Sequence, residues 1–350
     1  MDRSLRTVST HRKWTRVLKT VAFVIVFAIL LHSISYVLVD KTTMNNWVTY
    51  TYEQRDSIDV LWLGCSKTLF GISPLTLWNE YGIASFNIGY SGQRFADNYY
   101  NLKAALETQS PKLVVMDIGF INFEGVHEVR FRQFINSLTY SRGTLREKLV
   151  KLEAIDEFAD KTERFSLLFP LTYYHTEWKT LTSEDFQRIE SMDKGAGFSI
   201  KSTEFLDFQV LDKSETTDLS SLSSLEMLER IASLCRENNV ELLTVAYPCY
   251  AMGENNPQRY YNAFYDYAQE NNLTYINCFH RLDDIGIDYA TDFIDEFHVD
   301  YSGNQKLTKY MGKYLIDNYD IPDHRGEEAY SSWDDDYLVY SEYVKTRMGR

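Results

Sequence analysis

Short apolar runs recur along the chain and alternate with segments that have the period of a helix. The apolar runs, which we expect to be strands, cover residues 59–63, 84–88, 113–118, 240–246 and 273–276. The segments that we expect to be helices are residues 94–108, a stretch beginning near Ser224, residues 257–269 and residues 303–319. Strands that are apolar throughout and alternate with helices predict a parallel sheet covered by helices on both faces.

Two regions do not follow this alternation of strands and helices. Residues from about 125 to 220 are rich in charged, hydroxyl and aromatic side chains, and we interpret them as an insertion in an α/β domain spanning 58–322. Such insertions often form a substrate wall or lid, although many are only structural. In the tail, 323–350, apolar and aromatic residues recur at helical spacing, which predicts a helix packed on the domain, with a partner-binding helix as the alternative.

The N-terminal part of the chain has the pattern of a membrane anchor. Residues 20–39 are almost wholly apolar and carry no charge, and a helix of this length spans about 30 Å, the thickness of a bilayer core. Residues 1–19 contain six basic side chains and one acidic one, which predicts a cytoplasmic N-terminus. A juxtamembrane linker, 40–57, and an extracytoplasmic domain should follow. A cleaved signal peptide is the alternative, although its apolar stretch is normally shorter.

The net charge of the chain limits the classes of molecule that we expect it to bind. The chain carries −14 in total and residues 1–39 carry +5, so the remainder carries −19. An acidic external domain argues against nucleic acid as a partner. The four cysteines show no CxxC or zinc-ligand spacing, and we interpret them as buried free thiols. The histidines also lack metal-ligand spacing, so we expect no metal and no cofactor.

Ser66 is the first candidate for chemistry, because it follows directly on a predicted strand, in Leu63-Gly64-Cys65-Ser66. Ligands of open parallel sheets bind beyond the carboxyl ends of the strands. At the start of a helix, the Ser66 N–H can also stabilise a developing negative charge. A simple helix cap would explain the same serine, and Cys65 is a rival nucleophile that strand alternation points the other way.

His298 is the candidate base for this serine. It lies after the last strand and just before the last helix, and Asp295 stands three residues before it, where it can hold the Nδ1 proton. Asp292 and Glu296 are rival carboxylates. A third segment, Asn87–Gly92, follows the second strand and should reach the same edge of the sheet, where a glycine leaves its N–H accessible to a substrate oxygen.

At these residues the chain resembles the SGNH, or GDSL-type, hydrolase superfamily, over about residues 58–125 and 224–318. The resemblance implies a flavodoxin-like αβα fold with five parallel strands, Ser66 as nucleophile, Asp295 and His298 as its partners, and Ser66 and Gly92 as oxyanion donors. Cys65 stands where the family commonly has aspartate. The family places an asparagine after the third strand, in a Gly-x-Asn-Asp setting. Here a gapless alignment places Ile121 at that position, and Asn122 fits with a shift of one residue as a third oxyanion donor.

The anchor and the insertion are similar to a membrane-anchored cell-envelope branch of this superfamily, which includes the D-alanine-transfer and alginate O-acetylation proteins. That resemblance implies an esterase or O-acyltransferase acting on envelope polysaccharide, in partnership with a multi-spanning membrane acyltransferase. A non-catalytic protein that binds polysaccharide or scaffolds such a partner is the alternative. His175 and Lys194 are further candidates for lining an acceptor groove, although a structural role would suit each equally well.

Overall fold

The computed structural model describes residues 3–39, 46–186, 191–205, 208–250 and 256–349. The chain divides into two compact units, of which the smaller comprises Met1–Thr43 and Asp160–Arg188 and the larger comprises Met44–Ala159 and Ile189–Arg350. The first part of the predicted linker, residues 40–45, lies outside the described residues. The two units are considered separately below.

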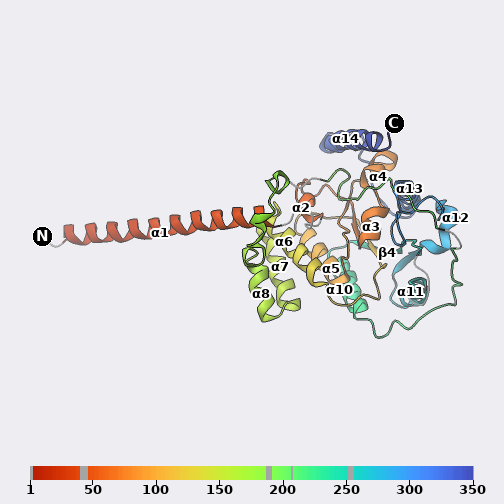
Figure 1. Ribbon diagram of the computed structural model, residues 1–350, viewed down its shortest axis with the longest axis horizontal. Coiled ribbons are helices and arrows are strands. Elements are labelled where there is room, and N and C mark those ends of the chain that lie inside the picture. The colour runs from red at the N-terminus through yellow and green to blue at the C-terminus, as the bar shows by residue number, and fades with distance from the viewer. Residues whose placement is uncertain (1–2, 40–45, 187–190, 206–207, 251–255, 350) are drawn as a thin grey trace. The chain divides into compact units, whose positions relative to one another are not determined.

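The smaller unit is built on one long helix, α1 (Arg3–Leu38), which is continuous in Figure 1. Its segment Trp14–Leu38 has a mean hydropathy of 2.5 and is long and apolar enough to cross a membrane. A signal sequence near an N-terminus has the same properties. The remaining elements of this unit are α8 (Lys161–Leu168), α9 (Leu171–Tyr174) and the short 3-10 helices η2 (Glu177–Lys179) and η3 (Ser183–Phe186). Both α9 and η3 contact α1.

The larger unit contains a parallel sheet of five strands. They are β1 (Val60–Leu63), β2 (Ser85–Asn87), β3 (Leu113–Asp117), β4 (Glu241–Ala246) and β5 (Thr274–Asn277). Their order in the sheet is β2-β1-β3-β4-β5, and every neighbouring pair is parallel. This is the flavodoxin-like order of a doubly wound sheet, so the predicted fold class is confirmed. Because all five strands run the same way, their carboxyl ends share one edge.

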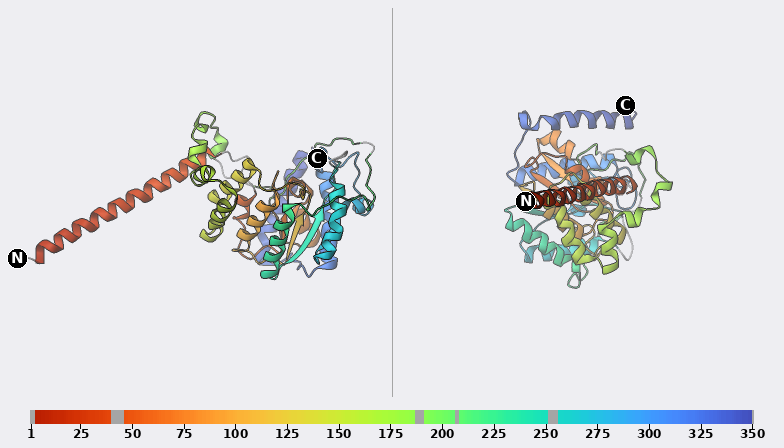
Figure 2. Two further views of the ribbon diagram at one scale, coloured as in Figure 1. Left: turned by 90° about the horizontal axis from the view of Figure 1, so that it is seen from below. Right: turned by 90° about the vertical axis from the view of Figure 1, so that its left-hand side faces the viewer.

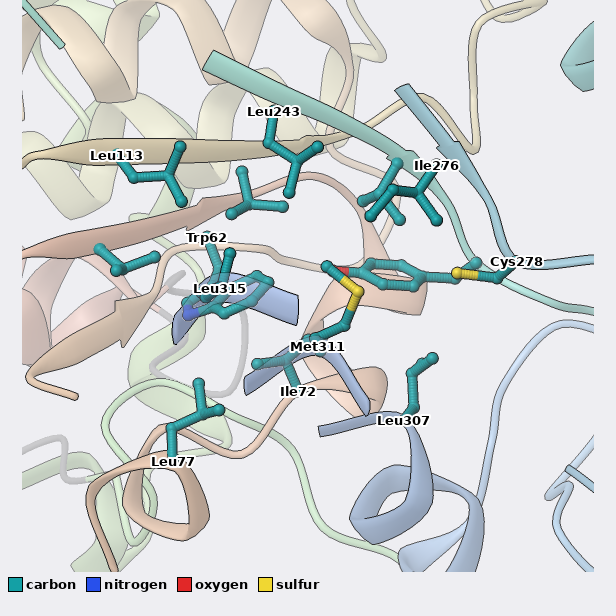
Figure 3. Packing of buried hydrophobic residues seen from close by; sticks show 14 of the residues in the cluster. Trp62, Ile72, Leu77, Leu113, Leu243, Ile276, Cys278, Leu307, Met311 and Leu315 are labelled. Atoms are coloured by element: carbon teal, nitrogen blue, oxygen red, sulfur yellow. The ribbon is translucent and has the colours of Figure 1, made fainter. Parts of the chain in front are cut away.

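One face of the sheet packs against α4 (Pro74–Tyr81) and α13 (Tyr301–Asn318), with the short α12 (Leu282–Ile285) beside α13. Figure 3 shows this core, in which Trp62 of β1 and Ile276 of β5 point toward Met311 and Leu315 of α13. Each of these side chains is less than a tenth exposed. The period-2 alternation of the strands puts every second residue on this face.

The other face is covered by α5 (Phe95–Ala105), α10 (Ser223–Glu237) and α11 (Gln258–Glu270). On β5, Tyr275 points away from the core of Figure 3 and its ring meets Phe264 of α11 edge to face, at 4.8 Å between centroids. Helix α10 contacts both α5 and β4. Figure 2 shows the helices on both faces of the sheet from two further sides.

The predicted insertion is divided between the two units. Its first part forms α6 (Glu128–Tyr140) and α7 (Leu145–Phe158), which belong to the larger unit, where α7 packs on α5 and α6 packs on α2 (Trp47–Tyr50). Its middle part, 160–188, belongs to the smaller unit. The segment from 191 to 222, apart from residues 206–207, which are not described, contains no helix or strand.

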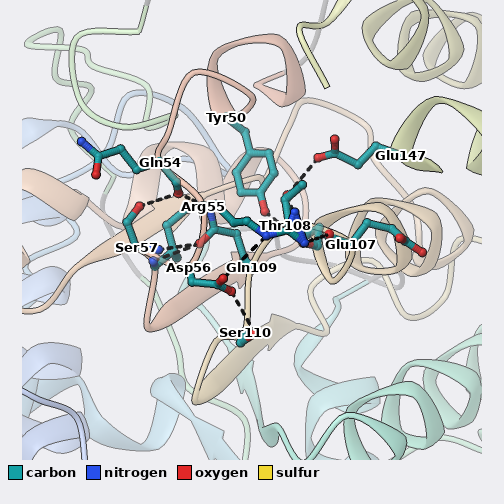
Figure 4. Close-up of polar contacts among 12 residues, drawn as sticks. Tyr50, Gln54, Arg55, Asp56, Ser57, Glu107, Thr108, Gln109, Ser110 and Glu147 are labelled. Atoms are coloured by element: carbon teal, nitrogen blue, oxygen red, sulfur yellow. Dashed lines mark hydrogen bonds and ion pairs between the residues drawn. The ribbon is translucent and has the colours of Figure 1, made fainter. Parts of the chain in front are cut away.

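The prediction of a linker does not hold for residues 46–57, because they are part of the folded larger unit. Figure 4 shows how the Gln109 side chain accepts from the N–H groups of Ser57 and Ile58, at 2.9 and 3.1 Å, and donates to the carbonyl of Gln54, at 2.6 Å. In addition, the Tyr50 ring is buried and its hydroxyl donates to the Ala105 carbonyl. These bonds tie residues 50–58 to the end of α5 and to the loop between α5 and β3.

The C-terminal tail forms a short 3-10 turn, η5 (Glu328–Tyr330), and then helix α14 (Ser331–Arg347). Trp333 of α14 is buried against Trp78 of α4, with ring centroids 5.5 Å apart, and Tyr340 and Val344 continue the same buried stripe. The Trp78 indole N–H donates to Asp334 at 3.0 Å. This helix therefore extends the hydrophobic core outward over α4.

Candidate active site

A tight turn connects β1 to α3 (Ser66–Gly71) and carries the candidate nucleophile. Gly64 adopts φ +153°, and a Cβ added there would lie 2.1 Å from the Thr68 hydroxyl and 2.6 Å from the Asp117 Cβ. Only glycine allows this close approach. Cys65 is the N-cap, and its sulfur accepts from the Lys67 N–H at 3.4 Å. Ser66 is consequently the first residue of the helix.

The structure brings Ser66 and His298 together, although 232 positions separate them in the sequence. The Ser66 Oγ lies 2.6 Å from His298 Nε2, and both oxygens of Asp295 lie 2.9 Å from His298 Nδ1. A carboxylate beside Nδ1 fixes the proton on that nitrogen, so Nε2 is left as an acceptor for the serine hydroxyl proton. This is the geometry of a nucleophile, a base and an orienting acid.

The loop that carries the base is held by its own backbone. Asp295 Oδ1 accepts from the N–H groups of Phe297 and His298, at 2.8 and 3.0 Å, and Phe293 bridges Val299 in an antiparallel pair. Partial burial raises the pKa of Asp295, but these hydrogen bonds and the His298 ring outweigh it, so the pKa lies below its ordinary value of 3.8. Asp295 is therefore ionised at neutral pH.

The rival carboxylate Asp292 is engaged elsewhere. Its side chain is fully buried, and Oδ2 accepts from the Lys306 ammonium and from the Asp288 N–H, both at 2.7 Å. Of the three acidic residues in this loop, Asp295 is the one whose oxygens reach the His298 ring in the described structure.

Behind Ser66 lies a buried polar network. Asp117, the last residue of β3, accepts from the Cys65 thiol at 3.2 Å, from the Thr68 hydroxyl at 3.3 Å and from the Gly119 N–H at 2.7 Å. Burial and the Asp117 carboxylate raise the pKa of Cys65 well above its ordinary value. Cys65 therefore stays a thiol that donates into the protein, and it does not compete with Ser66 as a nucleophile. All four cysteines are free and buried.

Lys67 is also buried, at 4% exposure, although it follows Ser66 directly. Its ammonium lies 2.6 Å from the Tyr261 hydroxyl and 3.5 Å from the Gly119 carbonyl, and that hydroxyl donates to the same carbonyl at 2.9 Å. Burial lowers the pKa of Lys67, but electrostatic attraction from its surroundings, which include the Asp117 carboxylate, outweighs burial, and the pKa lies well above its ordinary value. A fixed positive charge thus stands near the Asp117 carboxylate.

The candidate oxyanion donors occupy three different loops. The N–H of Ser66 is in the first turn of α3, where a helix has no internal partner for it. The loop after β2 runs beside the same turn, because a Cβ at Gly89 would lie 3.1 Å from the Cys65 carbonyl oxygen, and Gly92 in this loop has φ +70°. Asn122 lies in the turn after β3, and within the described residues it makes no hydrogen bond to Ser66 or His298. The roles of Gly92 and Asn122 as oxyanion donors therefore stay predictions.

Lys194 does not line an open groove. It is 9% exposed, and its ammonium forms ion pairs with Glu53 and Asp336, at 2.9 and 2.5 Å. The ammonium also lies 4.5 Å from the centroid of the Trp333 ring. Two carboxylates already neutralise this cation, so we correct its expected role in substrate binding to a structural one.

His175 belongs to the smaller unit, where its ring is exposed and Nδ1 lies 3.0 Å from the Thr172 carbonyl oxygen. Across the described ranges, no three His, Cys, Asp or Glu side chains converge in a way that could hold a metal ion.

Neither a protein-family model nor a curated protein matches the chain. Solved structures that it resembles include a protein assigned as an acylhydrolase from Bacteroides fragilis, at 10% identity and a TM-score of 0.36, covering 77% of this chain and 94% of the other. A protein assigned to the G-D-S-L lipolytic family from Desulfitobacterium hafniense has 14% identity and a TM-score of 0.36, covering 73% and 99%. A GDSL-like lipase from Bacteroides thetaiotaomicron has 10% identity and a TM-score of 0.32, covering 77% and 96%. Because these identities and scores are low, the roles of the residues rest on the geometry of this chain alone.

Three members of the site have no sequence motif that points to them. Asp117 lies near the carboxyl end of the strand predicted at 113–118, and the strand order places β3 beside β1, so its proximity to the Ser66 turn could have been anticipated. Lys67 reads in sequence as an exposed helix residue, and Tyr261 as one more tyrosine on an amphipathic helix. Only the packing of α11 brings them together.

Proposed function

We propose that this protein is a membrane-anchored, extracytoplasmic serine enzyme that hydrolyses or transfers acyl esters on cell-envelope polysaccharide. The observation that carries the proposal is the pair of contacts made by His298, with Ser66 Oγ at 2.6 Å on one nitrogen and Asp295 at 2.9 Å on the other. Simple helix capping does not require a serine to meet a histidine that is itself oriented by a carboxylate.

The reaction would follow from this geometry. His298 Nε2 takes the proton of the Ser66 hydroxyl as Oγ attacks the ester carbonyl, and the N–H of Ser66, with Gly92 and Asn122 as further candidates, stabilises the oxyanion. Nε2–H then protonates the leaving alcohol, so that the ester bond breaks and an acyl-serine forms. In the second half, water or a sugar hydroxyl gives its proton to Nε2 and takes the acyl group.

The anchor supports the location of this chemistry. A basic stretch precedes the apolar segment, so the larger unit would lie outside the cytoplasm, and a multi-spanning membrane acyltransferase would be a suitable acyl donor. Hydrolysis and transfer share every step up to the acyl-enzyme and differ only in the acceptor.

The test is labelling of the full-length protein in detergent micelles with a fluorophosphonate probe. We expect labelling of the wild type and of Ser91→Ala, a serine on the neighbouring loop, and no labelling of Ser66→Ala. Equal labelling of wild type and Ser66→Ala would remove Ser66 from the site. Absence of labelling in the folded wild type would favour a non-catalytic protein that binds polysaccharide or scaffolds a membrane partner.

To separate hydrolysis from transfer, turnover of an aryl acetate should be compared with and without an oligosaccharide acceptor. A gain in mass of the sugar that depends on both Ser66 and His298 would establish transfer, whereas acetate release that the acceptor leaves unchanged would establish hydrolysis.

A further inference from the structure

A cavity of about 610 Å³ lies at the β5 edge of the sheet, among residues that take no part in the site at Ser66. Strand β5 is an edge strand, so among the described residues no further strand closes this side. Its Tyr275 and Asn277 contribute to the lining together with residues of α11 and α13, the helices that cover the two faces of the sheet at this edge (Figure 1). The volume is in the range of small-molecule sites.

Aromatic rings form much of the wall. Tyr310 and Tyr314 stand four residues apart on α13 and therefore share one face of that helix. Tyr265 of α11 is 54% exposed. Flat rings that keep one face accessible and carry a hydroxyl at the tip suit a ligand with both apolar and polar surfaces.

The polar part of the cavity is held in place by the protein. The Asn262 amide donates to the carbonyls of Asp212 and Glu215, at 2.9 and 3.1 Å, which fixes the segment that crosses the edge of the sheet. Its oxygen accepts from the Asn277 amide at 3.3 Å and lies 2.9 Å from His280 Nε2. The site is therefore formed before any ligand arrives.

The charges around the cavity nearly balance. Lys213 and Arg281 are cationic, Asp266 is anionic, and Arg281 also pairs with Asp284 at 3.4 Å. Burial and the neighbouring Lys213 lower the pKa of His280, which keeps its ring uncharged at neutral pH. A highly charged ligand would find no matching excess of opposite charge in this lining.

We infer that this cavity binds a neutral, hexose-containing oligosaccharide. Such a ligand offers apolar ring faces to the tyrosines and many hydroxyl groups to Lys213 and Arg281, which donate hydrogen bonds, and to the tyrosine hydroxyls, which can donate or accept them. Both ligand surfaces then have partners among the described residues.

The position of the cavity connects it to the proposed chemistry, and this step alone rests on the proposed function. Asn277 ends β5 as Leu63 ends β1, on the shared carboxyl edge, and three strand spacings of about 4.8 Å separate the two strands by about 14 Å across the sheet. An oligosaccharide chain is long enough to span that distance. One part of a glycan would be held at β5 while another sugar reaches Ser66.

The test is calorimetric titration of the full-length protein in detergent micelles with maltotetraose, cellotetraose and mannotetraose. We expect at least one of them to bind, and Tyr265→Ala to weaken that binding about tenfold, equivalent to about 1.4 kcal/mol. Tyr265→Phe keeps the ring and should stay within about threefold of the wild type, because only the hydroxyl is lost. Tyr173→Ala, an exposed tyrosine of the smaller unit, should bind like the wild type.

Binding by none of the three tetrasaccharides would overturn the inference, as would binding that Tyr265→Ala and Arg281→Ala both leave unchanged. Binding of UMP in the absence of any tetrasaccharide binding would also overturn it, in favour of a phosphorylated ligand. Ser66→Ala should bind the oligosaccharide like the wild type. Loss of fluorophosphonate labelling and loss of sugar binding are thus separate results, and each proposal can fail alone.

Discussion

The two sides of the turn at Ser66 differ in exposure and in chemistry. On the outer side Ser66 contacts His298, which in turn contacts Asp295, and the side chains of these two residues are 20% and 51% exposed. On the inner side Cys65 and Lys67 are 2% and 4% exposed, and they face the buried Asp117 and Tyr261. Cys65 is the N-cap and Ser66 and Lys67 begin α3, so successive side chains leave this turn in different directions, and one short turn contacts both the His298 side and a polar core.

Because of this difference, we expect substitutions on the two sides of the turn to affect different properties of the protein. Groups on the outer side sit beside solvent and can lose a partner at little cost in folding free energy. Groups on the inner side are removed from water, so an unmatched charge there is expensive. We therefore expect changes on the outer side to alter the reaction and changes on the inner side to alter stability.

The largest expected effect is on the outer side. His298→Ala removes the base, so kcat/KM for an aryl acetate should fall by about 10⁴-fold or more, as is usual when one member of a catalytic triad is lost. The thermal midpoint should stay within a few degrees of the wild type. His127→Ala, an exposed histidine at the start of α6, is the matched control and should keep full activity. A fall of less than tenfold in His298→Ala would contradict the assignment of the base.

The next effect is on the inner side. Cys65→Asp places a second carboxylate against Asp117, and we expect it to lower the free energy of unfolding by about 3–5 kcal/mol, because two buried acids cannot both ionise without a matching cation. Cys65→Ser keeps a donor to Asp117 and should cost only about 1 kcal/mol. Denaturant unfolding of the full-length variants measures both values.

A double variant makes this test specific. Adding Asp117→Asn to Cys65→Asp restores a single carboxylate, so part of the lost stability should return, and the two changes should be non-additive. Additive losses would mean that Cys65 and Asp117 do not interact in the way that their 3.2 Å contact indicates.

The contrast between the two sides also explains which parts could be anticipated from sequence. The five strands fall within about one residue of the expected positions, because buried parallel strands are apolar throughout and are bounded by polar turns. Ser66 and His298 could be paired because both follow strands whose carboxyl ends must share an edge. Each of these expectations uses only local pattern and the direction of the strands.

The buried contacts on the inner side could not be predicted from the sequence in the same way. Nothing in the sequence shows that the Lys67 ammonium turns inward to the Tyr261 hydroxyl, 194 positions away. The sequence leaves both an acceptor groove and a structural role open for Lys194, and the structural role follows from its partners Glu53 and Asp336, which come from distant parts of the chain. Burial of a charge depends on partners that only the tertiary structure brings together.

A smaller effect concerns the orienting acid. Asp295→Asn removes the charge that stabilises the His298 imidazolium, and we expect kcat to fall by about 10–100-fold. This is less than the loss in enzymes whose triad acid is buried, because a half-exposed carboxylate acts through a higher effective dielectric constant. KM should change little. Steady-state kinetics on the aryl acetate separate the two constants, and an unchanged kcat would show that Asp295 does not orient the base.

The smallest expected effect is the pH dependence of stability, in which the two carboxylates should have opposite signs. Hydrogen bonds hold the pKa of Asp295 below 3.8 in the folded protein. The Asp295 carboxylate therefore adds to the free energy of unfolding above that pH, and this stabilisation is lost as the pH falls through the lower folded-state pKa. Burial outweighs Lys67 and the hydrogen bonds from Cys65, Gly119 and Thr68, and raises the pKa of Asp117 above 3.8. As the pH falls, the folded protein therefore binds a proton at Asp117 before the unfolded protein does. The contribution of Asp117 to the free energy of unfolding should increase as the pH falls toward 3.8.

Unfolding free energies of Asp295→Asn and Asp117→Asn, each compared with the wild type between pH 3 and 7, distinguish the two cases. The wild-type advantage over Asp295→Asn should shrink only below about pH 4, near the ordinary pKa of aspartate. The difference between the wild type and Asp117→Asn should shift in favour of the wild type as the pH falls from 7 toward 4. If both differences moved in the same direction, the two sides of the turn would not differ in how they hold a carboxylate.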